Sequence, residues 1–209
     1  MGRNPYWMIK NGVSQVVCMD IDDASLAAAQ KNLADFSQAE IKKCSVYDLD
    51  HCKHGRFDRV TCIGVLQFLA DPPLALKKMW SCVASGGELI LWVYGKKGNR
   101  LLLPIIHTLR VAGSRLPLPL AHRLAQAITI FAWPIIRLMP LSCDYYRNLK
   151  HLSFTNVESI IFDQILPRLV NFWDRNELKA LLEPLNGKLY IEEVQGNSWH
   201  VRIEKPLSC

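Results

Sequence analysis

The chain has 209 residues, of which 50% are hydrophobic and 21% are charged, with 11 glycines and 11 prolines. This composition excludes a wholly disordered chain, a collagen and a coiled-coil rod, and the length suits one compact domain. The longest stretch without a charge, 124–136, is shorter than the roughly 20 residues of a membrane-spanning helix. The N-terminal residues lack a signal-peptide pattern, and the seven scattered cysteines are typical of reduced thiols. We therefore expect a cytoplasmic protein.

The net charge of +6 is concentrated in one segment. Residues 96–151 contain nine lysines and arginines but a single acid, Asp144, whereas the rest of the chain holds 16 basic and 18 acidic residues. Because the basicity is regional, it does not indicate a general nucleic-acid-binding protein, and no nucleic-acid partner is expected.

Short β-rich runs alternate with helical patterns through the first half of the chain. We expect strands at 15–20, 41–46, 57–63 and 88–94, and helices at 5–10, at 24–36 and from Asp71, which precedes two prolines. Strands that alternate with helices predict an α/β fold with a parallel sheet.

The pattern resumes after the basic segment. A helix is expected at 174–182, followed by strands at 189–194 and 198–203, whose tight connection at 195–197 predicts an antiparallel hairpin. We expect three parts: an α/β core at 1–95, a basic, apolar helical insert or cap at 96–152, and the C-terminal part of the core at 153–209.

Polar or small residues follow three successive strands, where a doubly wound sheet binds its ligands. Asp20 is suited to accept from both ribose hydroxyls of a nucleotide, and Asp48 from an adenine amino group beside the Tyr47 ring. Gly64 would permit close approach of a ligand after the third strand. Each residue alone also fits a helix cap or a turn, but three in successive positions favour a nucleotide site.

Four segments in this order resemble the class I S-adenosylmethionine-dependent methyltransferases (methyltransferase type 11/12-like): VVCMDIDDASLAAAQKNL, CSVYDLD, RFDRVTCIGVLQFLADP and ALKKMWSCVASGGELILWVYG. The resemblance covers 2–94 and resumes weakly at 171–204. It implies a Rossmann-like doubly wound sheet with a terminal antiparallel hairpin, and S-adenosyl-L-methionine as the cofactor. The cofactor-binding residues that it implies are Gly2, Asp20, Ile21, Tyr47, Asp48, Cys62, Ile63 and Gly64.

The chain departs from the family at its N-terminus. Gly2 matches the last glycine of the family's G-x-G-x-G loop and 5–10 the first helix, but the strand before them is absent. In the family that strand lies between the strands expected at 15–20 and 57–63, so its absence leaves backbone groups unpaired in the interior, at a cost of several kcal/mol. Two hypotheses follow: the reading frame is truncated or its start is assigned too late, or the chain is a degenerate relative with weak or no cofactor binding.

The insert has an unusual mixture of apolar and basic residues at 100–140. We expect Leu102, Ile105, Ile106 and Leu109 on one helical face opposite Arg100, His107 and Arg110, and a cluster of Arg123, Gln126 and Arg137 on a second helix. Three interpretations compete: a cap over a lipophilic substrate, an interfacial helix pair on an anionic membrane surface, and an oligomer interface.

These observations favour a methyltransferase that acts on a small, lipophilic or lipid-linked acceptor, in the cytoplasm or on the inner face of the membrane. Gln67 is expected to face the same cleft as the cofactor site, while His107, His151, Tyr94 and His200 are unranked candidates for a base. The residues at 50–54, DHCKH, are interpreted as a solvated loop without a metal. The main alternative is a non-catalytic membrane-peripheral protein on a degenerate methyltransferase scaffold, and a weaker one is a nicotinamide-dependent dehydrogenase.

Overall fold

The computed structural model describes residues 2–100, 103–138 and 144–207. The elements of the first half are α1 (Arg3–Lys10), β1 (Val16–Asp20), α2 (Asp23–Asn32), β2 (Ala39–Lys43), η1 (Val46–Asp48), α3 (His51–His54), β3 (Phe57–Ile63), η2 (Leu66–Phe68), α4 (Pro72–Ser81) and β4 (Val83–Tyr94). Those of the second half are η3 (Lys97–Asn99), α5 (Leu103–Gly113), α6 (Leu118–Leu138), α7 (Asp144–Leu149), α8 (Phe154–Ile165), α9 (Arg175–Leu182), η4 (Glu183–Leu185), β5 (Lys188–Val194) and β6 (Ser198–Glu204).

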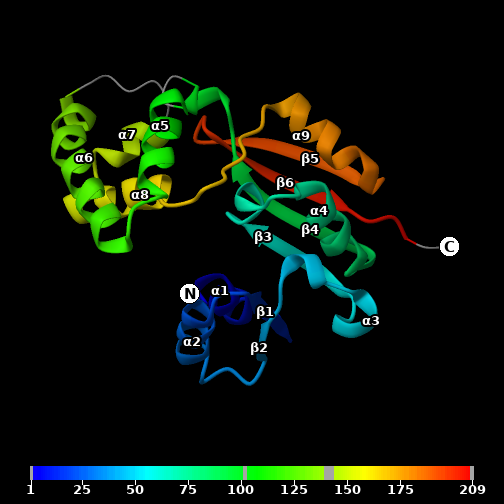
Figure 1. Cartoon of the computed structure of the whole chain (residues 1–209). Helices are drawn as coiled ribbons and strands as arrows, with labels where there is room; N and C mark the ends of the chain where they lie inside the picture. The colour runs from blue at the N-terminus through cyan, green and yellow to red at the C-terminus, as the bar shows by residue number, and fades with distance from the viewer. Residues whose placement is uncertain (1, 101–102, 139–143, 208–209) are drawn as a thin grey trace.

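Four strands form the main sheet in the order β3-β4-β6-β5 (Figure 1). The pair β3–β4 is parallel, whereas β6 is antiparallel to both β4 and β5. The structure is therefore the expected α/β fold with a mixed sheet, and β5 and β6 run as an antiparallel hairpin joined at 195–197.

The hydrophobic core lies on one face of this sheet. Alternate residues of β4, among them Leu89 and Leu91, are fully buried and pack in one cluster with Leu76 of α4 and Leu178 of α9. Burial of every second residue follows from the two-residue period of a strand. As the sequence predicts, α4 begins directly after Asp71, whose carboxylate accepts a hydrogen bond from the backbone N–H of Leu74 at 3.0 Å.

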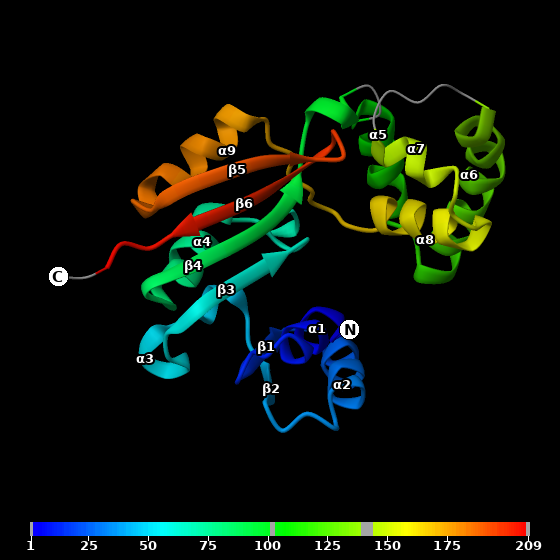
Figure 2. The ribbon, with the colours of Figure 1, turned by 180° about the vertical axis from the view of Figure 1, so that it is seen from behind.

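The strands β1 and β2 form a separate parallel pair. Within the described residues β1 does not pair with β3, and the two strands belong to separate sheets (Figure 2). A groove of about 950 Å³ is lined by 12–17 on one side and 56–61 on the other. Half of the backbone N–H and C=O groups of each edge strand point away from its single partner. Among the described residues the sheet is therefore split between β1 and β3.

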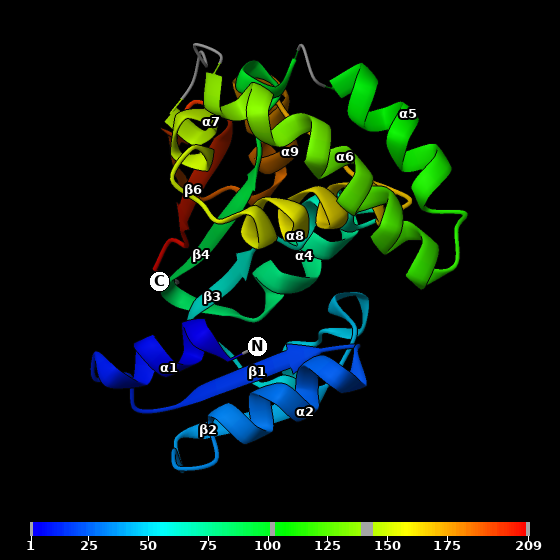
Figure 3. The ribbon, with the colours of Figure 1, turned by 90° about the vertical axis from the view of Figure 1, so that its left-hand side faces the viewer.

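The helices α5 to α8 gather into an insert at one end of the main sheet (Figure 3). The core of the insert is the packing of α8 against α5 and α6. The expected faces of α5 are wrong: Arg110 is buried, Ile105 is 58% exposed, and Leu102 lies outside the described residues. The Arg110 Nε group donates a hydrogen bond to the backbone carbonyl of Gln164 at 3.0 Å, which offsets the cost of burying it.

The second strand ends earlier than expected. β2 ends at Lys43 because the Ser45 hydroxyl accepts a hydrogen bond from the backbone N–H of Tyr47 at 3.2 Å and begins the 3-10 turn η1. Asp48 therefore ends a turn and not a strand. None of the described helices has both the length and the apolarity that crossing a membrane requires.

Candidate functional site

The turn after β1 fixes the orientation of Asp20. Its Oδ1 atom accepts hydrogen bonds from the backbone N–H groups of Ile21 at 2.7 Å and Asp22 at 3.0 Å. Asp22 in turn caps α2 by accepting from the N–H of Ser25 at 2.7 Å. The Ile21 side chain is exposed beside this turn, so the end of β1 presents a carboxylate held by its own backbone.

The turn η1 follows β2 with an exposed Asp48 and a partly buried Tyr47. The Tyr47 hydroxyl accepts a hydrogen bond from the backbone N–H of Asp71 at 3.0 Å, and its ring packs against the core cluster. Tyr47 thus ties η1 to the start of α4, a structural role that its sequence motif did not indicate. Asp48 is the polar group that η1 presents to solvent.

The end of β3 has a glycine where the backbone requires one. Gly64 has a φ of +73°, and its N–H donates to the Trp92 carbonyl of β4 at 3.0 Å. Ile63 is exposed, whereas Cys62 is buried. Burial raises the pKa of the Cys62 thiol to about 11, so this cysteine is neutral at physiological pH and contributes packing.

Gln67, in η2, is fully buried next to Tyr94, and its Nε2 and Oε1 atoms lack a hydrogen bond of good geometry to the described residues. Its Nε2 atom lies 3.8 Å from the position that a Cβ on Gly64 would occupy. A buried amide without a partner costs about 1–3 kcal/mol, and such groups in native proteins call for an explanation. An unpaired amide beside the Gly64 turn is the feature of this region that points most directly to a ligand.

Tyr94, at the end of β4, lies among aromatic rings. Its ring stacks on Phe172 at a centroid distance of 5.5 Å, and it meets Trp92 and Phe68 edge-on at 5.5 and 6.0 Å. Its hydroxyl accepts a hydrogen bond from Nε2 of Gln164 at 3.3 Å. Burial raises the pKa of the Tyr94 phenol, which therefore stays protonated near neutrality.

The histidine candidates lie elsewhere. His107 on α5 and His151 after α7 are exposed residues of the insert. His200 is on β6, opposite Trp92 in the strand register. Sequence reasoning missed Gln164, which lies outside every motif, and Phe172, which lies at the start of the weakly similar segment 171–204. Both reach Tyr94 only through the fold.

Gly2 precedes α1 with a φ of +85°. A Cβ at this position would lie 3.4 Å from the Leu33 side chain and 3.5 Å from the backbone of Ala29. The structure thus places Gly2 against α2 and its C-terminal cap, and the positive φ explains the choice of glycine.

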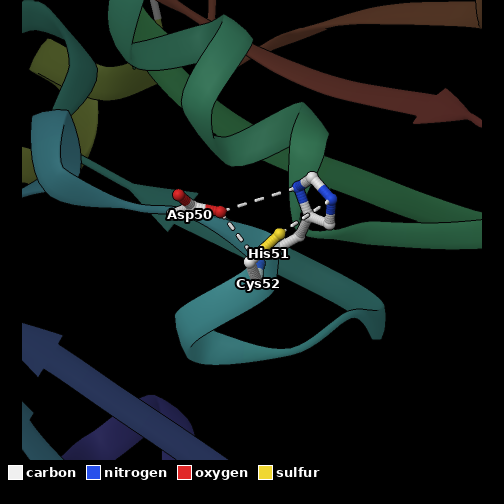
Figure 4. A group of neighbouring side chains, drawn as sticks. All are labelled: Asp50, His51 and Cys52. Carbon is white, nitrogen blue, oxygen red and sulfur yellow. Dashed lines mark hydrogen bonds and ion pairs between the residues drawn. The ribbon is translucent and has the colours of Figure 1, made fainter.

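Three metal-ligand residue types lie together at Asp50, His51 and Cys52 (Figure 4). The prediction of a loop at 50–54 is wrong, because 51–54 forms the short helix α3. The Asp50 carboxylate caps this helix by accepting a hydrogen bond from the N–H of Cys52 at 2.8 Å. His51 directs Nδ1 toward Asp50 at 3.8 Å and Nε2 toward Cys52 at 3.5 Å. The two nitrogens of the His51 ring contact different residues of the same short turn, which local packing explains. We therefore assign no metal ion to this group.

Comparison with known proteins shows that the first part of the chain is similar to one family. Residues 1–91 match the family model described as a methyltransferase domain. Over these residues, which are less than half of the chain, the sequence is similar to that family. An uncharacterized protein of Synechococcus is 33% identical over 92 residues, which are 43% of this chain and 22% of that protein.

The fold of the methyltransferase domain recurs in solved structures of low sequence identity. An O-methyltransferase family protein from Burkholderia thailandensis has a TM-score of 0.61 at 8% identity, and the match covers 100% of this chain and 49% of that one. PKMT2 from Rickettsia typhi in complex with AdoHcy has a TM-score of 0.60 at 12% identity, covering 90% and 43%. The chain thus spans about half or less of the length of these relatives.

Proposed function

We propose that the chain is an S-adenosyl-L-methionine-dependent methyltransferase that acts on a small, lipophilic or lipid-linked acceptor. The match of 1–91 to the methyltransferase domain carries the reaction class. The fold shared with PKMT2, which was solved with AdoHcy, supports the choice of cofactor.

The polar groups at the strand ends suit this cofactor. The Asp20 carboxylate would hold the ribose hydroxyls, and Asp48 would accept from the adenine amino group. Gly64 leaves room for the methionyl part, whose ammonium and carboxylate groups would satisfy the orphaned Gln67 amide. When bound, the cofactor supplies a sulfonium methyl group for in-line displacement, and the protein contributes alignment and exclusion of water.

The acceptor would lie at the end of β4, next to Tyr94. The rings of Phe68, Trp92 and Phe172 offer an apolar surface there, and Gln164 connects it to the insert. Tyr94 orients the acceptor through its neutral hydroxyl, which its raised pKa keeps protonated. His107 and His151 stay predictions for the base that a phenol or hydroxyl acceptor would require.

A second candidate function rests on the groove between β1 and β3. This groove separates Asp20 on one sheet from Gly64 on the other, and it would weaken a cofactor site that needs both. The separation favours a non-catalytic protein on a methyltransferase scaffold.

The two candidates differ in cofactor binding. Titration calorimetry with S-adenosylhomocysteine, followed by transfer of a labelled methyl group to phenols, quinols and lipids, distinguishes them. Saturable binding with transfer to one acceptor class supports the methyltransferase. Binding without transfer restricts the proposal to a cofactor-binding scaffold, and the absence of both would select the non-catalytic candidate.

A further inference from the structure

The side of α6 that faces away from α8 is apolar. Three buried residues mark the inner side, Ala121, Ala125 and Thr129, and α8 packs on α6 there. The opposite side exposes large apolar side chains, with Phe131 at 74% and Leu138 at 83%. We call the following residues the outer face of α6: Leu120, Ile130, Phe131, Ile135 and Leu138.

The outer face is long enough to form a surface in its own right. Phe131, Ile135 and Leu138 recur three or four residues apart, which places them on one strip of the helix, and Ile130 lies beside Phe131. At 1.5 Å per residue the strip runs about 27 Å from Leu120 to Leu138. Large contiguous apolar patches are uncommon on monomeric proteins and mark interaction sites.

Positive charge borders this strip. Arg123 and Arg137 are exposed along one edge of it, and Arg137 is held 4.1 Å above the Trp133 ring. α6 contains no aspartate or glutamate among its 21 residues. The turn before the helix adds an exposed Arg115, and the first residue of the helix is an exposed Leu118. Within α6, this side of the helix therefore presents apolar side chains and cations.

We propose that the outer face of α6 docks on an anionic lipid bilayer. The helix lies in the plane of the interface, with its apolar side chains at the boundary of headgroups and acyl chains. Arg123 and Arg137 lie among the lipid phosphates, since long basic side chains reach the headgroup level from an apolar face. The segment 96–151 contains nine basic residues and one acid, and this positive charge adds a general attraction between the insert and the anionic membrane.

A bilayer suits this face better than a second copy of the chain. In a symmetric dimer through α6, the same patch would meet itself, and two cationic borders would come together. The single acid of 96–151, Asp144, already forms an ion pair with Arg147. An anionic membrane supplies the missing counter-charge.

Vesicle sedimentation tests the proposal without cofactor or acceptor, so its outcome is independent of methyl transfer. We expect the chain to bind phosphatidylcholine vesicles with about one third phosphatidylserine at least about tenfold more tightly than neutral vesicles. This preference should shrink when the salt rises from about 0.1 M to about 0.5 M, because exposed charges are then screened.

Two double variants separate the apolar and charged contributions. Phe131→Glu with Ile135→Glu should weaken binding at least about tenfold, because carboxylates enter the apolar layer. Leu74→Glu with Leu169→Glu is the matched control, since both leucines are exposed and lie outside helices α5 to α8. Arg123→Gln with Arg137→Gln should reduce the preference for anionic vesicles, while the control Lys31→Gln with Lys53→Gln should leave it nearly unchanged.

Circular dichroism and the melting temperature first establish that each variant is folded. Undiminished binding by folded Phe131→Glu, Ile135→Glu protein would overturn the proposal, as would equal loss in its control. If the chain ignores vesicles but forms a dimer that this double variant dissociates, the outer face is a self-association surface and the proposal is wrong.

Discussion

The Gln164 side chain on α8 donates a hydrogen bond to the Tyr94 hydroxyl at 3.3 Å, and thereby joins the helical insert to the end of β4. The backbone carbonyl of Gln164 also accepts from the buried Arg110 of α5. One residue thus links two helices of the insert to the strand end where the acceptor is proposed to bind. The position of the insert and the orientation of the Tyr94 hydroxyl are therefore coupled.

Replacing Tyr94 tests whether its hydroxyl orients the acceptor. Tyr94→Phe keeps the ring contacts with Phe172 and Trp92 but removes the hydroxyl. We expect kcat to fall about tenfold or more with little change in the affinity for S-adenosylhomocysteine, because only the acceptor loses a contact. Tyr190→Phe, which removes a phenol hydroxyl of β5 that bonds to Glu204, is the matched control. Unchanged kcat for Tyr94→Phe would contradict the orienting role.

Gln67→Met tests whether the buried amide awaits a ligand. Methionine has a similar shape and no unpaired polar atoms, so the unliganded protein should gain about 1–3 kcal/mol of unfolding free energy. For a chain of this length the melting temperature should rise by about 2–4 °C per kcal/mol. The variant should at the same time bind S-adenosylhomocysteine more weakly. Gain of stability with full cofactor affinity would show that the amide does not contact the cofactor, and a loss of stability would show that it has partners in the folded protein.

The sequence predicted the features that depend on local order along the chain. The run 57–63 is bounded by polar residues and forms β3 with the expected limits, and Asp71 caps α4. Helical periodicity did not predict that Arg110 is buried, because its partner is a backbone carbonyl 54 residues away. Periodicity reports which residues share a face, whereas the neighbour that covers the face depends on tertiary packing.

The sequence predicted only part of the candidate site. The strand ends at Asp20 and Gly64 could be located because each follows a recognisable β-rich run. The role of Tyr47 could not be predicted, since its hydrogen bond to Asp71 joins two turns that are distant in sequence. The contribution of Gln164 depends on how the insert folds back over β4, for which the motifs of 2–94 carry no information.

Asp20→Ala tests the ribose assignment. The variant should weaken binding of S-adenosylhomocysteine at least about tenfold, since hydrogen bonds to a charged carboxylate contribute about 1.5–3 kcal/mol. Asp23→Ala is the matched control, because Asp23 is an exposed acid at the start of α2 that pairs with Lys43 at the surface. Both affinities can be measured by calorimetry. Equal affinities for Asp20→Ala and the unchanged protein would remove Asp20 from the site.

The buried thiol of Cys62 predicts a loss of stability in alkaline solution. Burial raises the pKa of Cys62 from 9.0 to about 11, so the folded chain holds this proton more tightly than the unfolded chain. The stability that this difference provides is complete below pH 9 and is lost as the pH rises through about 11. A shift of this size corresponds to about 3 kcal/mol across that window.

Cys62→Ala isolates this contribution from the other groups that titrate at high pH. The variant starts less stable, because a small cavity replaces the sulfur, but its unfolding free energy should fall less between pH 9 and pH 11. Denaturant unfolding at each pH measures the difference, and Cys52→Ala, which alters an exposed thiol, should follow the unchanged protein. Thiol reagents should label Cys52 in the folded chain well before Cys62. Parallel pH profiles for Cys62→Ala and the unchanged protein would mean that the Cys62 thiol ionises as readily in the folded chain as in the unfolded one.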